Sequence, residues 1–418
     1  MVDFEPLELS DEYSYLEAND EFLSNVYFED DQWSTAYQIG QCVSGCLSSV
    51  QYTIGKLLLV TFIQRLITLL NFPILIKHIS CIFLGLIILP DWIQRGDLQV
   101  TVTAGIPVVA LFLLFTPLPC KGVSAMLACI SSIICVQYLI PAQDFLSIRG
   151  ILMIFAMKVI SLAFDKGSNF SACDVVPILS YLFSPSTMEE LHSIFLSATL
   201  VGVAFCFLAY SSCLPIIVPE GSILTDYVVA QSFRTSHYFI CVLSQGLALL
   251  SGMRLSICSP FAVEVPRSLV EVVVAWNVPM HNFLHSYVYV QFTTLGTAAA
   301  ILSSFAISSL LHGFNFQISA VLLSLGFACY FENKLRNRMS SCFSICVRAR
   351  PCRNCNHEMK SSCWQTMFLN ALFFAAAVYQ LVYLGAPFDG EGAEVGYEWS
   401  HTIATWRRHG SCGLPQVS

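Results

Sequence analysis

The sequence predicts an all-α polytopic membrane protein, a bundle of about 11 transmembrane helices with short re-entrant or interfacial helices. Three observations point to this class. Of its 418 residues, 56% are hydrophobic and only 11% are charged, whereas soluble domains carry about 25% charged residues. The mean hydropathy is +0.67. Finally, apolar runs that are long enough to enter a bilayer follow one another with short breaks.

The apolar runs differ in length and purity. A helix needs about 20 apolar residues to cross the hydrocarbon core, and the runs at 100–118 and 123–140 contain no charged residue. Several others are short or interrupted, which is tolerated at membrane depth where protein or a cavity surrounds them. This pattern favours a bundle that encloses a site. The predicted elements are 54–70, 74–89, 100–118, 123–140, 151–164, 194–218, 238–253, 269–276, 287–311, 314–331 and 364–384.

Charge divides the chain into three parts. Residues 1–37 are acidic, and every acidic residue in them precedes the first basic residue, Lys56. Such a segment buries little apolar surface, so we expect a disordered, cytoplasmic tail. Its charge argues against nucleic acid as a partner. The membrane domain is expected at 38–388, and the tail at 389–418 is expected to be lumenal.

The densest cluster of basic residues in a short loop lies at 334–363. Basic loops stay on the cytoplasmic side, so this loop is predicted to be cytoplasmic. It is also rich in cysteine. Cys352, Cys355, His357 and Cys363 resemble a set of zinc ligands, although the second pair is irregular. A basic loop with free thiols is the favoured alternative, and no metal site is assigned. Most of the 18 cysteines lie in apolar runs and are interpreted as packing.

His312 is the most informative single residue. It follows an apolar run, and the next charged side chain after it is Glu332. An ionisable residue at membrane depth is costly and marks a functional site by default, and a hydrogen-bonded core histidine is the alternative. Gly313 is a residue type that ends helices in the left-handed conformation. His312 is therefore expected at a helix C-terminus, where a neutral imidazole can act as a general base.

Asn277 is the second residue singled out, 35 positions before His312. Its amide can orient a substrate or donate a hydrogen bond to a developing oxyanion, and a helix cap before Pro279 is the alternative. A straight helix over 287–311 would be about 37 Å long. Bringing Asn277 and His312 together therefore requires a break, expected near Gly296, or a long narrow substrate.

Two further pairs of residues each allow a structural and a functional interpretation. Lys158 and Asp165 can share one helix face, either as an end-of-helix pair with a snorkelling lysine or as a contact to an anionic substrate group. His281 and His285 have the i, i+4 spacing of a two-histidine metal site, but no acidic residue stands between them. We interpret the two histidines as interfacial polar residues.

The sequences WNVPM at 276–280 and LLHGF at 310–314 match, in type and spacing, the Asn and His signatures of the membrane-bound O-acyltransferase family. The segments 149–165 and 320–336 add further matches, so the chain resembles this family from about residue 42 to 388. The closest likeness is to the branch that acylates secreted Wnt proteins. One departure stands out: members of that branch usually carry Gly-Pro-Trp after the segment matching 181–183, where this chain has 184–190 without it.

The resemblance implies a fold in which the helices surround an acyl tunnel in the endoplasmic reticulum membrane. It implies transfer of a palmitoleoyl group from palmitoleoyl-CoA to a serine hydroxyl of Wnt, as needed for Wnt secretion and signalling. His312 would be the base, and Asn277 would align the thioester. Trp276 and Ser308 are expected to line the substrate path, because they lie beside or one turn from these two residues. Acyl-CoA would be a co-substrate, with no permanently bound cofactor.

Two other functions remain open at this stage. A different acyltransferase of the same family would act on a lipid or on another secreted protein. A non-enzymatic transporter or receptor would use His312 as a proton relay or polar contact, without acyl-CoA turnover.

Overall fold

The computed structural model is built from helices, and the only bridge between extended residues in its described part joins Ile345 and Met359. It describes residues 10–70, 72–89, 93, 96–183, 194–218, 224–352, 356–388 and 399–410. The first group of helices comprises α1 (Ser10–Leu69), α2 (Ile74–Ile88), α3 (Gly96–Val100), η2 (Thr101–Gly105), α4 (Ile106–Phe115), α5 (Lys121–Leu139) and α6 (Ala142–Lys166).

The remaining elements follow in order along the chain. They are η3 (Ala172–Asp174), α7 (Val175–Phe183), α8 (Ile194–Ile217), α9 (Thr225–Ser251), α10 (Pro260–Glu264), α11 (Leu269–Trp276), α12 (Val278–Leu284), η4 (His285–Tyr289), α13 (Val290–Phe292), η5 (Thr293–Leu295), α14 (Thr297–Leu311), α15 (Phe316–Phe343), α16 (Trp364–Gly385) and α17 (Trp399–Gly410).

Six described helical segments are long and apolar enough to cross a membrane, which makes the chain a multi-pass membrane protein. They are Thr35–Leu69, Gly96–Phe115, Lys121–Leu139, Ala142–Lys166, Phe195–Ile217 and Trp364–Gly385. Shorter apolar helices, α2 and α14 among them, accompany these. The all-helical membrane fold is thus confirmed, whereas the number of about 11 membrane helices remains a prediction.

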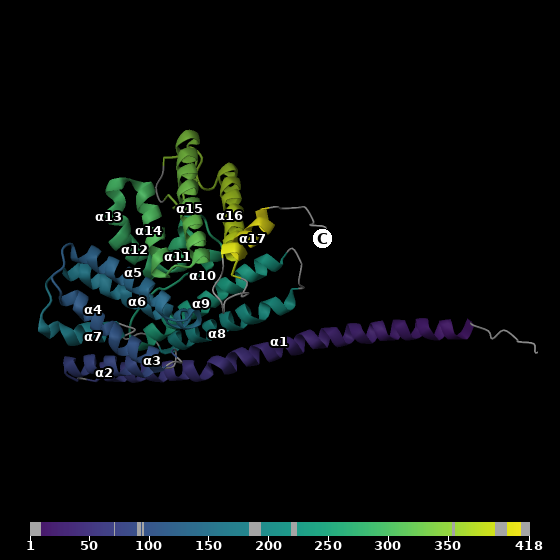
Figure 1. The fold of residues 1–418 in the computed structure, drawn as a ribbon. Coiled ribbons are helices and arrows are strands. Elements are labelled where there is room, and N and C mark those ends of the chain that lie inside the picture. Colours follow the sequence, from purple (N-terminus) through teal and green to yellow (C-terminus); the bar gives the residue numbers. More distant parts are fainter. Residues whose placement is uncertain are drawn as a thin grey trace, which may run out of the picture.

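Helix α1 lies along one side of the bundle, and α14, α15 and α16 stand on the opposite side (Figure 1). The first part of α1 projects beyond the other helices (Figure 1). Because α1 begins at Ser10, helical backbone runs through most of the acidic segment for which we expected disorder. The order and the cytoplasmic side of residues 1–37 remain predictions.

Two hydrophobic clusters form most of the core in the described residues, and a third, smaller one lies between α11, α15 and α16. The larger one joins α4, α5, α6 and α7 to Met280 of α12 and Leu311 of α14. The second one joins α1, α8 and α9 to the segment around α10 and α11, and it includes Ala275. The junction of α11 and α12, where Asn277 lies, therefore stands between the two clusters. Burial of apolar surface on both sides holds this junction in place.

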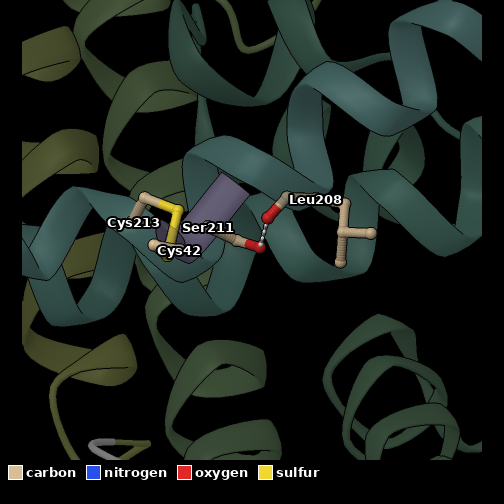
Figure 2. Close-up of a disulfide and its surroundings, with 4 residues drawn as sticks. All are labelled: Cys42, Leu208, Ser211 and Cys213. Atoms are coloured by element: carbon tan, nitrogen blue, oxygen red, sulfur yellow. Dashed lines mark hydrogen bonds between the residues drawn. A yellow bond between two sulfur atoms is a disulfide. The ribbon is translucent and has the colours of Figure 1, made fainter. Parts of the chain in front are cut away.

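A disulfide between Cys42 and Cys213 connects α1 to the C-terminal part of α8 (Figure 2). It closes a sequence separation of 171 residues. Ser211, beside it, donates a 2.9 Å hydrogen bond to the carbonyl of Leu208. Disulfides persist in oxidising compartments and are rare in the cytosol. The bond therefore favours an oxidising environment for this part of α1, whereas residues 1–37 are predicted to face the cytoplasm.

We expect Cys213→Ser to free the thiol of Cys42. Maleimide labelling of the denatured protein without a reducing agent should then count an additional thiol per chain compared with the wild type. The matched control is Cys46→Ser, which removes a free thiol close to the pair and should lower the count. If Cys213→Ser also lowers the count, Cys42 and Cys213 are not bonded in the mature protein.

Candidate active site

Asn277 lies at the point where α11 ends and α12 begins. Its Oδ1 accepts a 3.0 Å hydrogen bond from the backbone N–H of Met280, so the side chain caps α12, and a proline follows in the first turn. Asparagine is a favoured N-cap because its short side chain reaches the unpaired amides of the first turn. The cap alternative is therefore confirmed. The cap uses only the carbonyl oxygen, and no hydrogen bond from Nδ2 joins it to the described part of the chain.

The chain after Asn277 folds into a helical hairpin. One limb is formed by α12, η4 and α13, and the other is α14. Between the limbs, η5 ends at Gly296, whose φ of +99° is accessible to glycine at little cost. The expected break near Gly296 is thus confirmed. Each limb contains the same number of residues, and Asn277 and His312 are the residues that directly precede the first limb and follow the second.

The two limbs touch mainly near the turn. Helix α14 packs against η4, α13 and η5, while α12 leads away toward α11. Met280 and Leu311, close to the two signature residues, still belong to one hydrophobic cluster. Within the described residues, no hydrogen bond joins Asn277 to His312. The arrangement brings the two residues to one end of the hairpin and does not pair them directly.

His312 is the C-cap of α14, as expected. Its backbone N–H donates to the carbonyl of Ser309 at 3.1 Å, and the next residue, Gly313, has a φ of +84°. The imidazole is half-buried. Immediately afterwards Asn315 caps α15, accepting 3.1 Å from the N–H of Ile318. His312 is therefore held in the four-residue link 312–315 between α14 and α15, whose first and last residues are helix caps, so little backbone freedom remains.

A side-chain amide from α5 fixes this link from outside. Gln137 accepts 2.6 Å from the N–H of Phe314 and donates 2.9 Å to its carbonyl. A side chain at position 313 would meet Gln137 and the ring of Phe145 on α6. Glycine is therefore needed here for its conformation and for space. The sequence pattern identified Gly313 as a helix stop, but the partners on α5 and α6 carried no signal.

A positive charge lies near His312. Arg149 of α6 is half-buried and interacts electrostatically with the imidazole. It belongs to the segment 149–165 that carries part of the family resemblance. A guanidinium recognises carboxylate and phosphate groups through paired hydrogen bonds. Arg149 is the residue near His312 that can attract an anionic group of a substrate.

Trp276 and Ser308, the two residues expected to line a substrate path, occupy different settings. Ser308 is buried on α14, one turn before His312. Trp276 is half-buried and stacks on His237 of α9, with ring centroids 4.2 Å apart. Phe233 continues this stack to Phe388, beyond α16. A row of stacked rings therefore packs around Trp276, the residue that precedes Asn277 in the sequence.

His237 is a residue that sequence reasoning missed. Its Nε2 lies 3.0 Å from the carbonyl oxygen of Trp276 and 3.3 Å from the sulfur of Cys241. These contacts hold the last turn of α11, and thereby Asn277, against α9. The available signal was an ionisable side chain at the edge of the apolar run 238–253.

Lys158 and Asp165, the pair that the sequence placed on one helix face, both make contacts that hold helices together. Lys158 donates to the carbonyls of Tyr181 and Leu182 at the end of α7, at 2.8 and 3.1 Å. Asp165 accepts from the hydroxyl of Tyr287 on η4 at 2.9 Å, so it joins α6 to the hairpin. Lys158 thus binds the carbonyl end of α7, a partner that neither the end-of-helix pair with Asp165 nor the snorkelling lysine predicted. The departing stretch 184–190 lies outside the described residues.

The start of α11 is held by a buried ion pair on α15. Arg336 has no exposed surface, and its Nε donates 2.6 Å to Oε1 of Glu332. The second oxygen of Glu332 accepts 2.8 Å from the N–H of Leu269, the first residue of α11. Ser268 caps the same helix. One carboxylate thus fixes both α15 and the helix that ends at Asn277.

Comparison with known proteins bears on this arrangement. The membrane-bound O-acyltransferase family, MBOAT, matches residues 227–354, a range that contains both Asn277 and His312. The porcupine protein-serine O-palmitoleoyltransferase of Mus musculus is 30% identical over 435 aligned positions, covering 88% of this chain and 93% of the mouse protein.

The chain belongs to the membrane-bound O-acyltransferase family. The Homo sapiens porcupine protein has the same identity and coverage as the mouse protein. The Anopheles gambiae protein of that name is 33% identical over 301 positions, or 58% of this chain and 61% of the relative. The family resemblance inferred from the two signatures is therefore confirmed, and the signatures lie inside the matched domain.

We expect Gly313→Ala to destabilise the protein by about 1–3 kcal/mol, because a methyl group there meets packed atoms and the left-handed backbone disfavours it. Thermal unfolding of the detergent-solubilised protein measures the effect. Gly150→Ala is the control, since a methyl group at that helical position meets open space. Equal unfolding temperatures for the two variants would show that the link after His312 is not tightly packed.

Proposed function

We propose that the chain is a protein-serine O-palmitoleoyltransferase of the endoplasmic reticulum membrane. It moves a palmitoleoyl group from palmitoleoyl-CoA to a serine hydroxyl of a Wnt protein, as needed for Wnt secretion and signalling. The observation that carries this proposal is similarity over 88% of the chain to relatives that bear this enzyme name. The hairpin supports it, because His312 and Asn277 flank one open end.

The imidazole of His312 acts as the general base. One ring nitrogen takes the proton from the serine hydroxyl as the oxygen attacks the thioester carbonyl, because an unassisted hydroxyl is a weak nucleophile. The tetrahedral intermediate collapses with cleavage of the carbon–sulfur bond. The imidazolium then returns its proton to the CoA thiolate, so the products are the serine ester and free CoA. The thioester supplies the driving force.

Asn277 has a second task besides capping α12. Its Nδ2 donates a hydrogen bond to the developing oxyanion, while Oδ1 remains bound to the N–H of Met280. The cap fixes the amide plane before the substrate arrives, and such preorganisation is what makes oxyanion stabilisation effective. The cap and the catalytic role therefore complement each other.

The substrates approach from opposite sides of the membrane. The bundle of about 11 membrane elements surrounds an apolar tunnel for the acyl chain, which spares it from water. CoA enters from the cytosol and the Wnt serine from the lumen, and Arg149, beside His312, attracts an anionic group of the acyl donor. Trp276 and Ser308 line the path between Asn277 and His312.

A lipid acyltransferase of the same family is distinguished by its acceptor. Labelled palmitoleoyl-CoA is supplied with either a Wnt hairpin peptide or a lysolipid, and the purified protein should acylate the peptide. Transfer to the lysolipid alone would assign a lipid substrate. A transporter or receptor would turn over neither.

We expect His312→Ala to lower the transfer rate by about 10²- to 10⁴-fold, the usual contribution of a general base. The readout is label transferred to the Wnt peptide. The unfolding temperature of His312→Ala should stay near the wild-type value, because the backbone of His312 rather than its imidazole caps α14. His285→Ala is the matched control, an exposed histidine of the same hairpin, and it should retain transfer. Substantial transfer by His312→Ala would show that His312 is not the general base. His237 would then be the next histidine to test for that role.

Asn277→Ser separates the two tasks of Asn277. Serine keeps an oxygen that can cap α12 but lacks the Nδ2 donor, so transfer should fall by about 10²- to 10³-fold with little change in unfolding temperature. Asn277→Ala removes both groups and should lower stability as well. If Asn277→Ser is as active as the wild type, Asn277 serves only as a cap.

A further inference from the structure

Three potential metal ligands come together in the loop that follows α15. The sulfur atoms of Cys346 and Cys352 and a ring nitrogen of His357 lie within 4.8 Å of one another. Zinc binds thiolates at about 2.3 Å and imidazole at about 2.0–2.1 Å, so tetrahedral ligand atoms stand about 3.5–3.8 Å apart. The three groups are therefore close to the spacing that one zinc ion imposes.

The histidine is oriented as a metal ligand. Its Nε2 lies 2.8 Å from the hydroxyl of Ser340, a buried residue on the last turns of α15. Its Nδ1 is buried and has no hydrogen-bond partner in the described part of the chain. When Nε2 donates its proton to Ser340, Nδ1 presents a lone pair. Histidines that bind metals are commonly fixed in this way by a hydrogen bond on the other ring nitrogen.

An unpartnered buried ring nitrogen is costly unless something occupies it. A cation between His357 and the two sulfur atoms satisfies Nδ1 and stabilises the thiolates together. The set differs from the one that the sequence pattern suggested. Cys346 takes part, whereas Cys363 is the N-cap of α16 and lies outside the group. Cys355 falls outside the described residues.

The backbone of the cluster is connected to the candidate active site. The carbonyl of Cys346 accepts 3.1 Å from Arg267, and the carbonyl of Ala349 accepts 3.2 Å from the hydroxyl of Ser268. Arg336 donates 2.9 Å to the carbonyl of Val347. The loop therefore docks on the first turn of α11, the helix that ends at Asn277.

We propose that Cys346, Cys352 and His357 bind a structural zinc ion, which holds this loop against α15 and the start of α11. The remaining coordination position belongs to another thiolate or to water. The loop is predicted to face the cytosol, where thiols stay reduced, so thiolate ligation rather than a disulfide suits its location. This proposal is independent of the acyl transfer reaction.

The test is elemental analysis of the full-length protein, purified in detergent without added chelator. We expect about one zinc per chain in the wild type and in Cys363→Ser, a cysteine of the same loop outside the cluster. Cys352→Ser and His357→Ala should lose most of it. Ser340→Ala should weaken zinc binding by about 10- to 100-fold in a competition titration with a chromogenic chelator, because it removes the hydrogen bond that orients His357.

X-ray absorption at the zinc edge gives a readout that needs no variant. Scattering from two sulfur atoms and at least one imidazole supports the site. Wild-type protein without zinc, equal zinc loss in Cys363→Ser, or hydroxylamine-sensitive acylation of Cys352 would each overturn the proposal. Since metal content is measured without acyl-CoA, failure of the site leaves the proposed reaction untouched.

Discussion

The buried ion pair between Glu332 and Arg336 is the interaction on which this end of the molecule depends. The guanidinium is fully buried, pairs with Glu332, reaches the carbonyl of Val347, and stacks 3.9 Å from the centre of the Phe373 ring on α16. Removing one partner of such a pair typically costs about 3–5 kcal/mol, because it leaves an uncompensated buried charge. Here the pair also sets the position of α11. The location of Asn277 thus follows from charges on a different helix.

The features that could be predicted from sequence are those set by local backbone chemistry. His312 ends α14 because Gly313 adopts a left-handed conformation, and the hairpin turns at Gly296 for the same reason. The all-helical membrane class follows from composition, which leaves few charges for a soluble surface. Each of these inferences needs only neighbouring residues or averages over the chain.

The features that escaped prediction depend on long-range contacts. Gln137 contacts the link after His312 across a separation of 177 residues, and the disulfide joins residues 171 positions apart. Lys158 looked like a possible substrate contact, but it caps α7, which no local pattern reveals. Cys346 rather than Cys363 belongs to the loop cluster because the chain folds back there, where the backbone N–H of Cys346 donates a 3.0 Å hydrogen bond to the carbonyl of Met359. Where helices are tilted or broken, the length of an apolar run is also a poor predictor of whether it spans the membrane.

The two limbs of the hairpin contain equal numbers of residues, and an insertion in either limb would change the position of His312 relative to Asn277. Inserting a residue into α14 ahead of His312 would turn the imidazole by about 100° around the helix axis and shift it by about 1.5 Å. The same insertion in the turn around Gly296 would leave both limbs in register. Length variation among related chains should therefore be tolerated at the turn and excluded from the limbs, where it would change how His312 is presented relative to Asn277.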